Sequence, residues 1–182
     1  MTQAKTTLVV DTNVLSRAIN PKQTDSYKPL FEELERQYIF TVSGFTRFEL
    51  MRSSDKAHRN AVANYISQEM VSVDLSRVLM DFSARVYYLY SKHPVTKGKN
   101  ITEGDIINAA LAIIKGCPVL THDGSDYPAP FFRELIRRPI TLKSAKNKDV
   151  IEMVYLLEPD MEHIKYCLVS TRSSWCAWRS RS

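Results

Sequence analysis

Cysteine is scarce in this chain of 182 residues, and its three cysteines form no Cys-x-x-Cys pair. They are Cys117, Cys167 and Cys176. An odd number without a paired motif argues against a disulfide framework. A reducing, intracellular compartment is the simplest setting for such a chain. We therefore expect a cytoplasmic protein.

Long apolar runs are also missing. Residues 106–114 form the most apolar stretch, which is far too short to span a bilayer and contains Asn108. The first seven residues hold no apolar segment of the kind that a signal peptide requires. We therefore expect no membrane span and no membrane partner.

Glycine is rare as well, with five residues in the whole chain and no glycine-rich loop that could hold a phosphate. No Ser/His/Asp or Cys/His arrangement stands out, and the histidines are expected to pack or lie at the surface. What the chain does have is a mild basic excess, a net charge of +5 with a pI near 9.1. That balance permits a nucleic-acid partner without demonstrating one.

The length fits one domain, and apolar runs alternate with helical spacing along most of it. Strands are predicted at residues 6–10, 38–42, 70–73, 117–120 and 140–142. Helices are predicted at residues 14–19, 29–38, 43–51, 55–69, 75–90, 102–115 and 131–137, with Asp74 as the N-cap before residue 75. This alternation predicts an α/β fold with a mostly parallel central sheet of about five strands and helices on both faces.

The last forty residues follow a weaker pattern. Residues 150–157 have the spacing of one more amphipathic helix, and beyond Pro159 little periodicity remains. The end of the chain carries arginines and no acid, together with Trp175 and Trp178, for which packing is favoured over base stacking. We interpret residues 143–182 as a C-terminal extension of unknown role.

Four acidic residues are predicted to gather at one edge of the sheet. Asp11 and Asp123 follow the first and fourth strands, Glu49 lies early in the helix after the second strand, and Asp105 lies in the first turn of the helix before the fourth strand. Carboxylates held together raise one another's pKa unless a cation neutralises them. Hard oxygen ligands of this kind suit Mg²⁺ or Mn²⁺.

Each of these acids also has a structural interpretation. Glu49 lies three residues after Thr46, and Asp105 lies three after Thr102, so each fits a helix capping box. The Asp105 helix is otherwise almost wholly apolar, so a buried carboxylate there needs a partner, and Asn108 lies one turn later on the same face. Asp123 and Asp126 have the alternative role of forming a turn around Gly124.

Four segments together resemble the PIN-domain ribonucleases, especially the VapC-type toxins of prokaryotic toxin–antitoxin pairs. These segments are residues 8–15 (LVVDTNVL), 42–50 (VSGFTRFEL), 104–112 (GDIINAALA) and 119–127 (VLTHDGSDY). Each alone is a weak signal, but their order and spacing follow the family. The resemblance covers residues 6–142, which implies a PIN-like nuclease domain at 1–142 and leaves 143–182 unmatched.

The resemblance implies a metal-dependent endoribonuclease that uses a water activated by Mg²⁺ or Mn²⁺. In the family pattern Asp11, Glu49 and Asp105 bind the metal, and the fourth acid matches Asp123 or Asp126, of which Asp123 is preferred here. Two further residues, Asn13 and Thr121, are implied to orient carboxylates or waters. The resemblance also implies an RNA substrate, an antitoxin partner and a homodimer.

Two other functions compete with this interpretation. One is a PIN-like module that binds RNA without cleaving it, although the chain keeps all four acids. The other is a phosphohydrolase of the haloacid dehalogenase type, which also begins with an Asp after the first strand. That class requires a second Asp two residues later, where this chain has Asn13.

Overall fold

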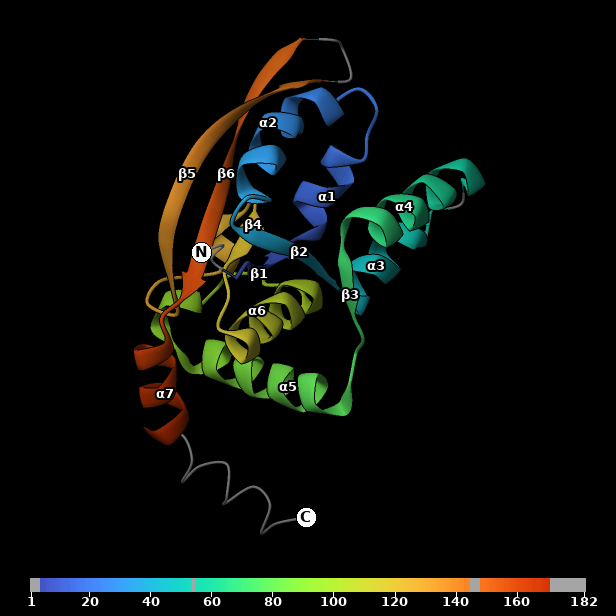
Figure 1. Ribbon diagram of the computed structural model, residues 1–182. Helices are drawn as coiled ribbons and strands as arrows, with labels where there is room; N and C mark the ends of the chain where they lie inside the picture. Colours follow the sequence, from blue (N-terminus) through green and yellow to red (C-terminus); the bar gives the residue numbers. More distant parts are fainter. Residues whose placement is uncertain (1–3, 54, 145–147, 171–182) are drawn as a thin grey trace.

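A six-stranded mixed sheet forms the centre of the protein in a computed structural model that describes residues 4–53, 55–144 and 148–170 (Figure 1). The strand order is β3-β2-β1-β4-β6-β5. Their bounds are β1 Thr6–Val10, β2 Tyr38–Ser43, β3 Val71–Val73, β4 Val119–Thr121, β5 Phe132–Lys143 and β6 Asp149–Pro159. Strands β3, β2, β1 and β4 are mutually parallel, whereas β6 runs antiparallel to both β4 and β5.

Seven α-helices surround the sheet in the described part of the chain. They are α1 Thr12–Ala18, α2 Thr24–Leu34, α3 Gly44–Met51, α4 Lys56–Glu69, α5 Arg77–Lys92, α6 Glu103–Lys115 and α7 Met161–Ser170, with short 3₁₀ helices η1 Pro94–Thr96 and η2 Gly124–Asp126. Helices α1 and α2 cover one face of the sheet, α5 and α6 cover the other, and α3 and α4 project to one side (Figure 1). The predicted α/β class is confirmed, with six strands where about five were expected.

The two faces of β1 explain its position in the middle of the sheet. Leu8 and Val10 pack into the cluster that includes α1 and α2, and Val9 packs into the cluster that includes α5 and α6. All three side chains are fully buried. Successive side chains of a strand point to opposite faces, so a short uninterrupted apolar run is the pattern of a strand covered on both sides.

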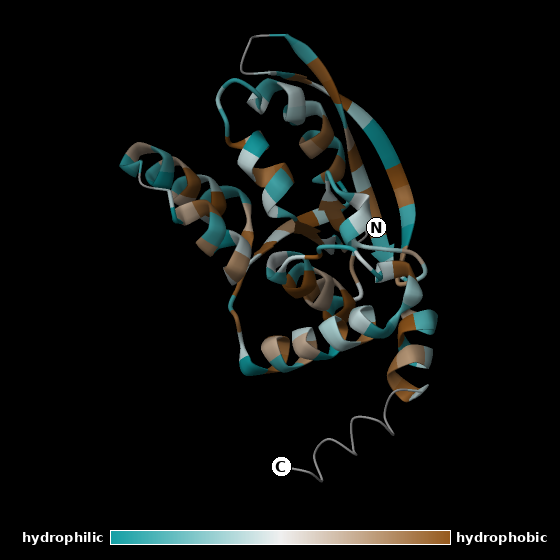
Figure 2. Cartoon of the chain, turned by 180° about the vertical axis from the view of Figure 1, so that it is seen from behind, coloured by the Kyte–Doolittle hydropathy of each residue, from teal (hydrophilic) through white to brown (hydrophobic). Residues whose placement is uncertain are grey.

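Two predicted helices are wrong. Residues 132–137 lie instead in β5, which Phe131 directly precedes, and residues 150–157 lie in β6; the two strands form a hairpin of 12 and 11 residues. In β6, Val154 and Leu156 enter one core cluster while Leu157 enters the other, because β6 lies between β4 and β5 and is covered on both faces. Polar and apolar residues alternate along the hairpin (Figure 2). The predicted strand at 140–142 is the end of β5.

The hairpin extends beyond residue 142, where the predicted domain ends, and its second strand belongs to the same sheet. The boundary expected after residue 142 falls one residue before β5 ends, and the segment beyond it supplies β6, paired with β4 through Val119–Leu157 and Thr121–Tyr155. Helix α7 then packs Ile164 into the core. Trp175, Trp178 and the terminal arginines lie outside the described residues.

Smaller differences occur at helix ends. Helix α5 is capped by Ser76, whose hydroxyl accepts from the Leu79 amide, so the prediction of Asp74 as N-cap is wrong. Helix α2 begins at Thr24 and contains Pro29, where a polar connection was expected up to residue 28. Within the described residues, no helix is long and apolar enough to cross a membrane.

We predict that Leu156→Ala lowers the free energy of unfolding by about 2–4 kcal/mol, because this side chain is 2% exposed and its loss leaves a cavity under β6. Urea unfolding followed by circular dichroism measures the effect. Ile151→Ala on the same strand is the control: its side chain is 70% exposed, and the expected change is below about 0.5 kcal/mol. Equal effects of the two variants would contradict the placement of β6 inside the core.

Candidate functional site

The candidate site lies where the strand order reverses. From β1 the chain proceeds to β2 and β3 on one side, whereas β4 pairs with β1 on the other side. The carboxyl ends of β1 and β4 therefore lie side by side, and they carry Asp11 and Thr121. In open α/β sheets such a switch point leaves a crevice in which ligands bind.

Asp11 is the central side chain of the site and is 2% exposed. Its Oδ1 accepts from the Thr12 amide at 2.6 Å and from Asn108 Nδ2 at 3.2 Å. Its Oδ2 accepts from Asn13 Nδ2 at 2.9 Å and from Thr121 Oγ1 at 2.8 Å. Both oxygens are thus held by neutral donors, which fix the direction of the carboxylate without cancelling its charge.

Asn108, on α6, links Asp11 to the start of α3. Its Oδ1 accepts from Ser43 Oγ at 2.8 Å and from Thr46 Oγ1 at 3.3 Å, which leaves its amide nitrogen turned to Asp11. Sequence reasoning placed Asn108 beside Asp105 and missed Ser43 and Thr46. The available signal was Ser43 itself, the N-cap of α3, whose hydroxyl accepts from the Thr46 amide.

Glu49 faces the start of α1. Its Oε2 accepts from Thr12 Oγ1 at 2.6 Å. Because Ser43 caps α3, the capping-box interpretation of Glu49 is wrong. A β-carbon at Gly104 would lie 3.3 Å from Glu49 Oε2 and 3.2 Å from Phe45 Cε1, so the glycine lets the first turn of α6 approach α3 closely.

Asp105 does form the capping box that was weighed for it. Its Oδ2 accepts from the Thr102 amide at 2.9 Å and from Thr102 Oγ1 at 2.7 Å. The charge of Asp105 also contributes to raising the pKa values of Asp11 and Asp126. Capping the helix and facing the acidic edge are therefore compatible roles of one buried side chain.

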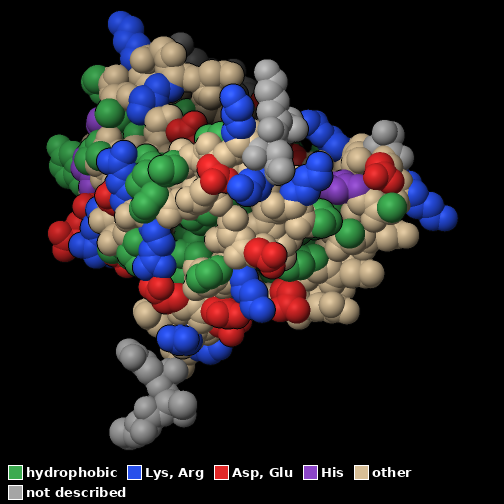
Figure 3. Space-filling view, turned by 90° about the horizontal axis from the view of Figure 1, so that it is seen from above, with side chains coloured by type: hydrophobic (Ala, Val, Ile, Leu, Met, Phe, Trp, Pro, Cys, Tyr) green, Lys and Arg blue, Asp and Glu red, His purple; other side chains and the backbone are tan. Residues whose placement is uncertain are grey.

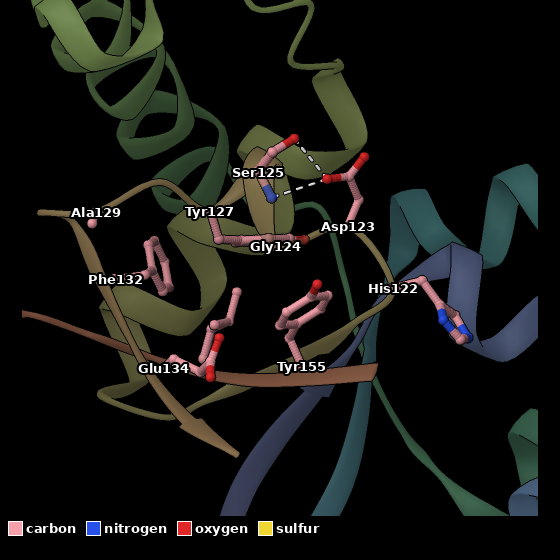
Figure 4. A pocket seen from close by; sticks show the side chains of 10 residues that line it. His122, Asp123, Gly124, Ser125, Tyr127, Ala129, Phe132, Glu134 and Tyr155 are labelled. Carbon is pink, nitrogen blue, oxygen red and sulfur yellow. Dashed lines mark hydrogen bonds between the residues drawn. The ribbon is translucent and has the colours of Figure 1, made fainter. Parts of the chain in front are cut away.

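The two acids of the turn after β4 differ in surroundings. Asp123 is exposed, and its Oδ1 accepts from the Ser125 amide at 2.9 Å and from Ser125 Oγ at 2.6 Å, as drawn in Figure 4. Asp126 is half-buried, and its pKa is affected by Asp105 and Asp11. The turn-forming interpretation therefore describes Asp123 better, and Asp126 is the acid that lies toward the other carboxylates.

Burial and mutual repulsion raise two carboxyl pKa values. The pKa of Asp11 rises to about 6, mainly through burial, with smaller contributions from Asp105 and Glu49, while the hydrogen bond from Thr121 opposes the rise. The pKa of Asp126 rises to about 7, again mainly through burial, then through Asp105, Asp123 and Asp11, while Lys99 lowers it. Paired acids with raised pKa values are typical of functional sites.

Asn13 and His122 complete the surroundings of the switch point. Besides Asp11, the Asn13 amide nitrogen reaches Thr121 Oγ1 at 3.0 Å, and its Oδ1 accepts from the His122 amide at 3.0 Å. The His122 ring points away, with Nδ1 2.7 Å from the Met153 carbonyl and Nε2 hydrogen-bonded to the Tyr27 hydroxyl. A packing role was expected for His122, and its buried contacts agree with it.

Comparison with known proteins assigns this arrangement to a family. The sequence pattern of the PIN domain matches residues 8–127. This chain belongs to the PIN domain family. The matched span includes Asp11, Glu49 and Asp105, together with both acids of the turn after β4. No curated protein matches the chain.

A solved structure shares the fold. It is described as the crystal structure of VapBC2 from Rickettsia felis bound to a DNA fragment from their promoter. The similarity covers 64% of this chain and 87% of that chain, with a TM-score of 0.54 and 22% sequence identity. At this identity the likeness concerns the PIN fold, whose site residues have to be judged from the geometry of this chain.

The donor chemistry of the site fits a hard divalent cation. Carboxylate oxygens dominate it, and burial together with a smaller contribution from repulsion between the acids raises the pKa values of Asp11 and Asp126. Among the described residues, no group of three or more His, Cys, Asp or Glu side chains is arranged so that it could hold a metal ion in this structure. Mg²⁺ does not need one, because it keeps several waters and binds through one or two carboxylates.

Basic side chains do not gather into one large patch on the face seen in Figure 3. There Lys and Arg are interspersed with Asp and Glu. Any basic contact to a ligand on that face therefore has to be argued from individual residues.

We predict that Asp126→Asn raises the melting temperature of the metal-free protein at pH 8 by about 2–6 °C, allowing for the water that reaches this half-buried side chain. The folded pKa of about 7 exceeds the usual value of 3.8, so the stability contributed by neutral Asp126 is present below pH 4 and lost as the pH rises toward 7. Most of the difference should therefore disappear at pH 5. Calorimetry in EDTA at both pH values measures it.

The matched control is Asp81→Asn, which removes the same charge from an exposed side chain on α5. Its expected shift in melting temperature is within about 1 °C at either pH. A stabilisation by Asp126→Asn that is equal at pH 5 and pH 8 would contradict the assigned cause.

Proposed function

We propose that the protein is a nuclease that hydrolyses RNA phosphodiester bonds with Mg²⁺ or Mn²⁺. The observation that carries the proposal is the buried Asp11 carboxylate at the switch point, with Asp105, Glu49 and Asp126 around it and only neutral donors bonded to it. Membership of the PIN domain family supports nuclease chemistry at these residues.

Asp11, Asp105, Glu49 and Asp126 are the residues that would hold the metal. Thr12, Asn13, Asn108 and Thr121 keep the two Asp11 oxygens in fixed directions, and the Thr12 hydroxyl does the same for Glu49. A bound divalent cation lowers the pKa of water and neutralises charge on a phosphodiester. Preoriented carboxylates reduce the rearrangement that binding such a cation requires.

The geometry favours Asp126 over Asp123 as the fourth acid of the site. Asp123 Oδ1 is engaged by both polar groups of Ser125, so this acid already has a structural role in the turn. Asp126 is half-buried among the other acids, where its charge is costly without a cation. Asp123 is then a residue that shapes the loop.

We also propose that the protein is the toxin of a toxin–antitoxin pair and acts as a homodimer. The solved structure with the same fold is described as a VapBC2 assembly, and it supports a partner protein of the antitoxin class for this chain. Co-expression with the protein encoded by the adjacent reading frame, followed by light scattering, tests both the partner and the subunit number.

The proposed activity predicts that purified protein cleaves single-stranded RNA with Mg²⁺ or Mn²⁺ and that EDTA abolishes the cleavage. Asp11→Asn and Asp105→Asn should each reduce the cleavage rate at least 100-fold, because a ligand oxygen becomes an amide. Gel analysis of a labelled RNA measures the rate, and circular dichroism checks the fold. Intact RNA after incubation of metal-loaded, inhibitor-free protein at several pH values would refute the enzymatic proposal.

The assignment of the fourth acid makes a separate prediction. Asp126→Asn should reduce metal-dependent cleavage at least 30-fold, whereas Asp123→Asn should change it less than about 3-fold, because its amide oxygen can still accept from Ser125. The shift of melting temperature on adding Mn²⁺ gives a second readout, which should be reduced in Asp126→Asn alone. The opposite order of the two variants would assign the fourth position to Asp123.

A further inference from the structure

A row of four residues crosses the sheet next to the acidic site. Thr121 of β4 is paired with Tyr155 of β6, and Tyr155 is paired with Arg137 of β5. On the other side, Thr121 Oγ1 donates to Asp11 at the end of β1. The row therefore runs from a buried carboxylate, through a hydroxyl and a tyrosine ring, to an exposed guanidinium.

These four side chains lie on the same face of the sheet. Val119 and Leu157 belong to the cluster around α5 and α6, and Tyr155 packs against it. Because side chains alternate along a strand, Thr121 shares the face of Val119, and Arg137 shares the face of its cross-strand partner Tyr155. Three strand spacings separate β1 from β5, which is a distance of about 14 Å.

A pocket of about 380 Å³ lies beside this row, between the turn after β4 and the hairpin, and Tyr155 is the residue of the row that lines it (Figure 4). Tyr155 and Phe132 give it an apolar wall, and Ser125, Asp123 and Glu134 give it a polar rim. A β-carbon at Gly124 would be in ordinary van der Waals contact with the Tyr155 ring, at 3.4 Å, so the turn packs directly against the tyrosine. A partly aromatic, partly polar pocket suits a nucleoside.

Arg137 differs from the other arginines of β5. Arg133 is paired with Glu158, and Arg138 makes a two-pronged pair with Glu33 at 2.7 and 3.0 Å. The Arg137 guanidinium lies 5.4 Å from the centre of the Tyr155 ring, and within the described part of the chain it has no carboxylate partner. Its planar fork is therefore available to an external anion, and guanidinium groups bind phosphate with two parallel hydrogen bonds.

We propose that an RNA strand crosses the sheet along this row, so that Arg137 binds a phosphate near the scissile one and the pocket holds a nucleoside between them. This subsite rests on the proposed nuclease function, because Asp11 marks the position of the cleaved bond. Acidic side chains surround that bond, so a basic side chain for a neighbouring phosphate has to lie beside the acidic site. Arg137 lies there, on the same face of the sheet. Arg137 is a substrate-binding residue and touches no reacting atom.

The test compares the cleavage kinetics of Arg137→Gln and wild-type protein on short single-stranded oligoribonucleotides. The expected result is a KM about 5- to 20-fold higher with kcat changed less than 2-fold, because one charge-assisted contact distant from the chemistry is lost. Arg137→Lys should recover part of the loss, since it keeps the charge without the fork. Arg133→Gln removes the same charge from a paired arginine of the same strand and should change KM less than 2-fold.

A second set of RNAs identifies the contact. In each, one phosphate near the mapped cleavage site is replaced by a neutral methylphosphonate. The increase in KM caused by Arg137→Gln should vanish when the methylphosphonate is at one position of the RNA and persist when it is at any other. This is the result expected when the lost contact involves a single phosphate. A penalty that persists at every position, or a KM equal to that of wild type on unmodified RNA, would overturn the proposal.

Binding measured in EDTA separates this inference from the proposed function. By fluorescence anisotropy, Arg137→Gln should weaken binding of the unmodified RNA about 5- to 20-fold and reduce the slope of log affinity against log salt by about 0.7. Wild-type binding that depends on Arg137 without any cleavage would refute the nuclease and retain the subsite. Cleavage that is unaffected by Arg137→Gln would retain the nuclease and refute the subsite.

Discussion

Burial of one carboxylate is the constraint on which the site depends. Asp11 is 2% exposed and lies at the end of a strand covered on both faces, so each of its oxygens needs hydrogen-bond donors. The donors come from the start of α1, from α6 and from β4, and they are all neutral. These donors satisfy the geometry of the carboxylate without a countercharge; burial raises its pKa, and the hydrogen bonds from Thr121 and Thr12 offset only part of the rise.

The parallel half of the sheet creates that constraint and then extends it. Because β1 and β4 end at the same edge, the first turn of α1 and the turn after β4 meet there, and Asn108 brings α3 into the same network through Ser43 and Thr46. Glu49 and Asp105 are therefore held near Asp11 by contacts that also stabilise helices. A group of like charges persists at this edge because the surrounding fold determines its position.

The sequence predicted the parts that local chemistry decides. The run up to Val10, the apolar helix closed by Gly116 and the acids at strand ends follow from patterns within a few residues, and the structure has them. It failed for residues 131–137 and 150–157, where the pattern is compatible with a helix and the strand pairing depends on partners far along the chain, such as Val119 for Leu157. The choice between Asp123 and Asp126 could not be made from the sequence for a similar reason, since the burial of Asp126 depends on residues that approach only in the folded protein.

The part of the chain that was predicted poorly, the hairpin of β5 and β6, is also the part outside the family match. The family pattern ends at residue 127, so it contains the acidic edge and excludes the hairpin of β5 and β6. The acids therefore lie in the part of the chain that matches the PIN domain, whereas the surface beside them is formed by strands outside that match. The hairpin is connected to the acidic edge through one residue, because Tyr155 of β6 is paired with Thr121, whose hydroxyl donates to Asp11. Substrate selection in this chain is thus expected to depend on residues 132–159, and the hydrolytic chemistry on the residues that precede them.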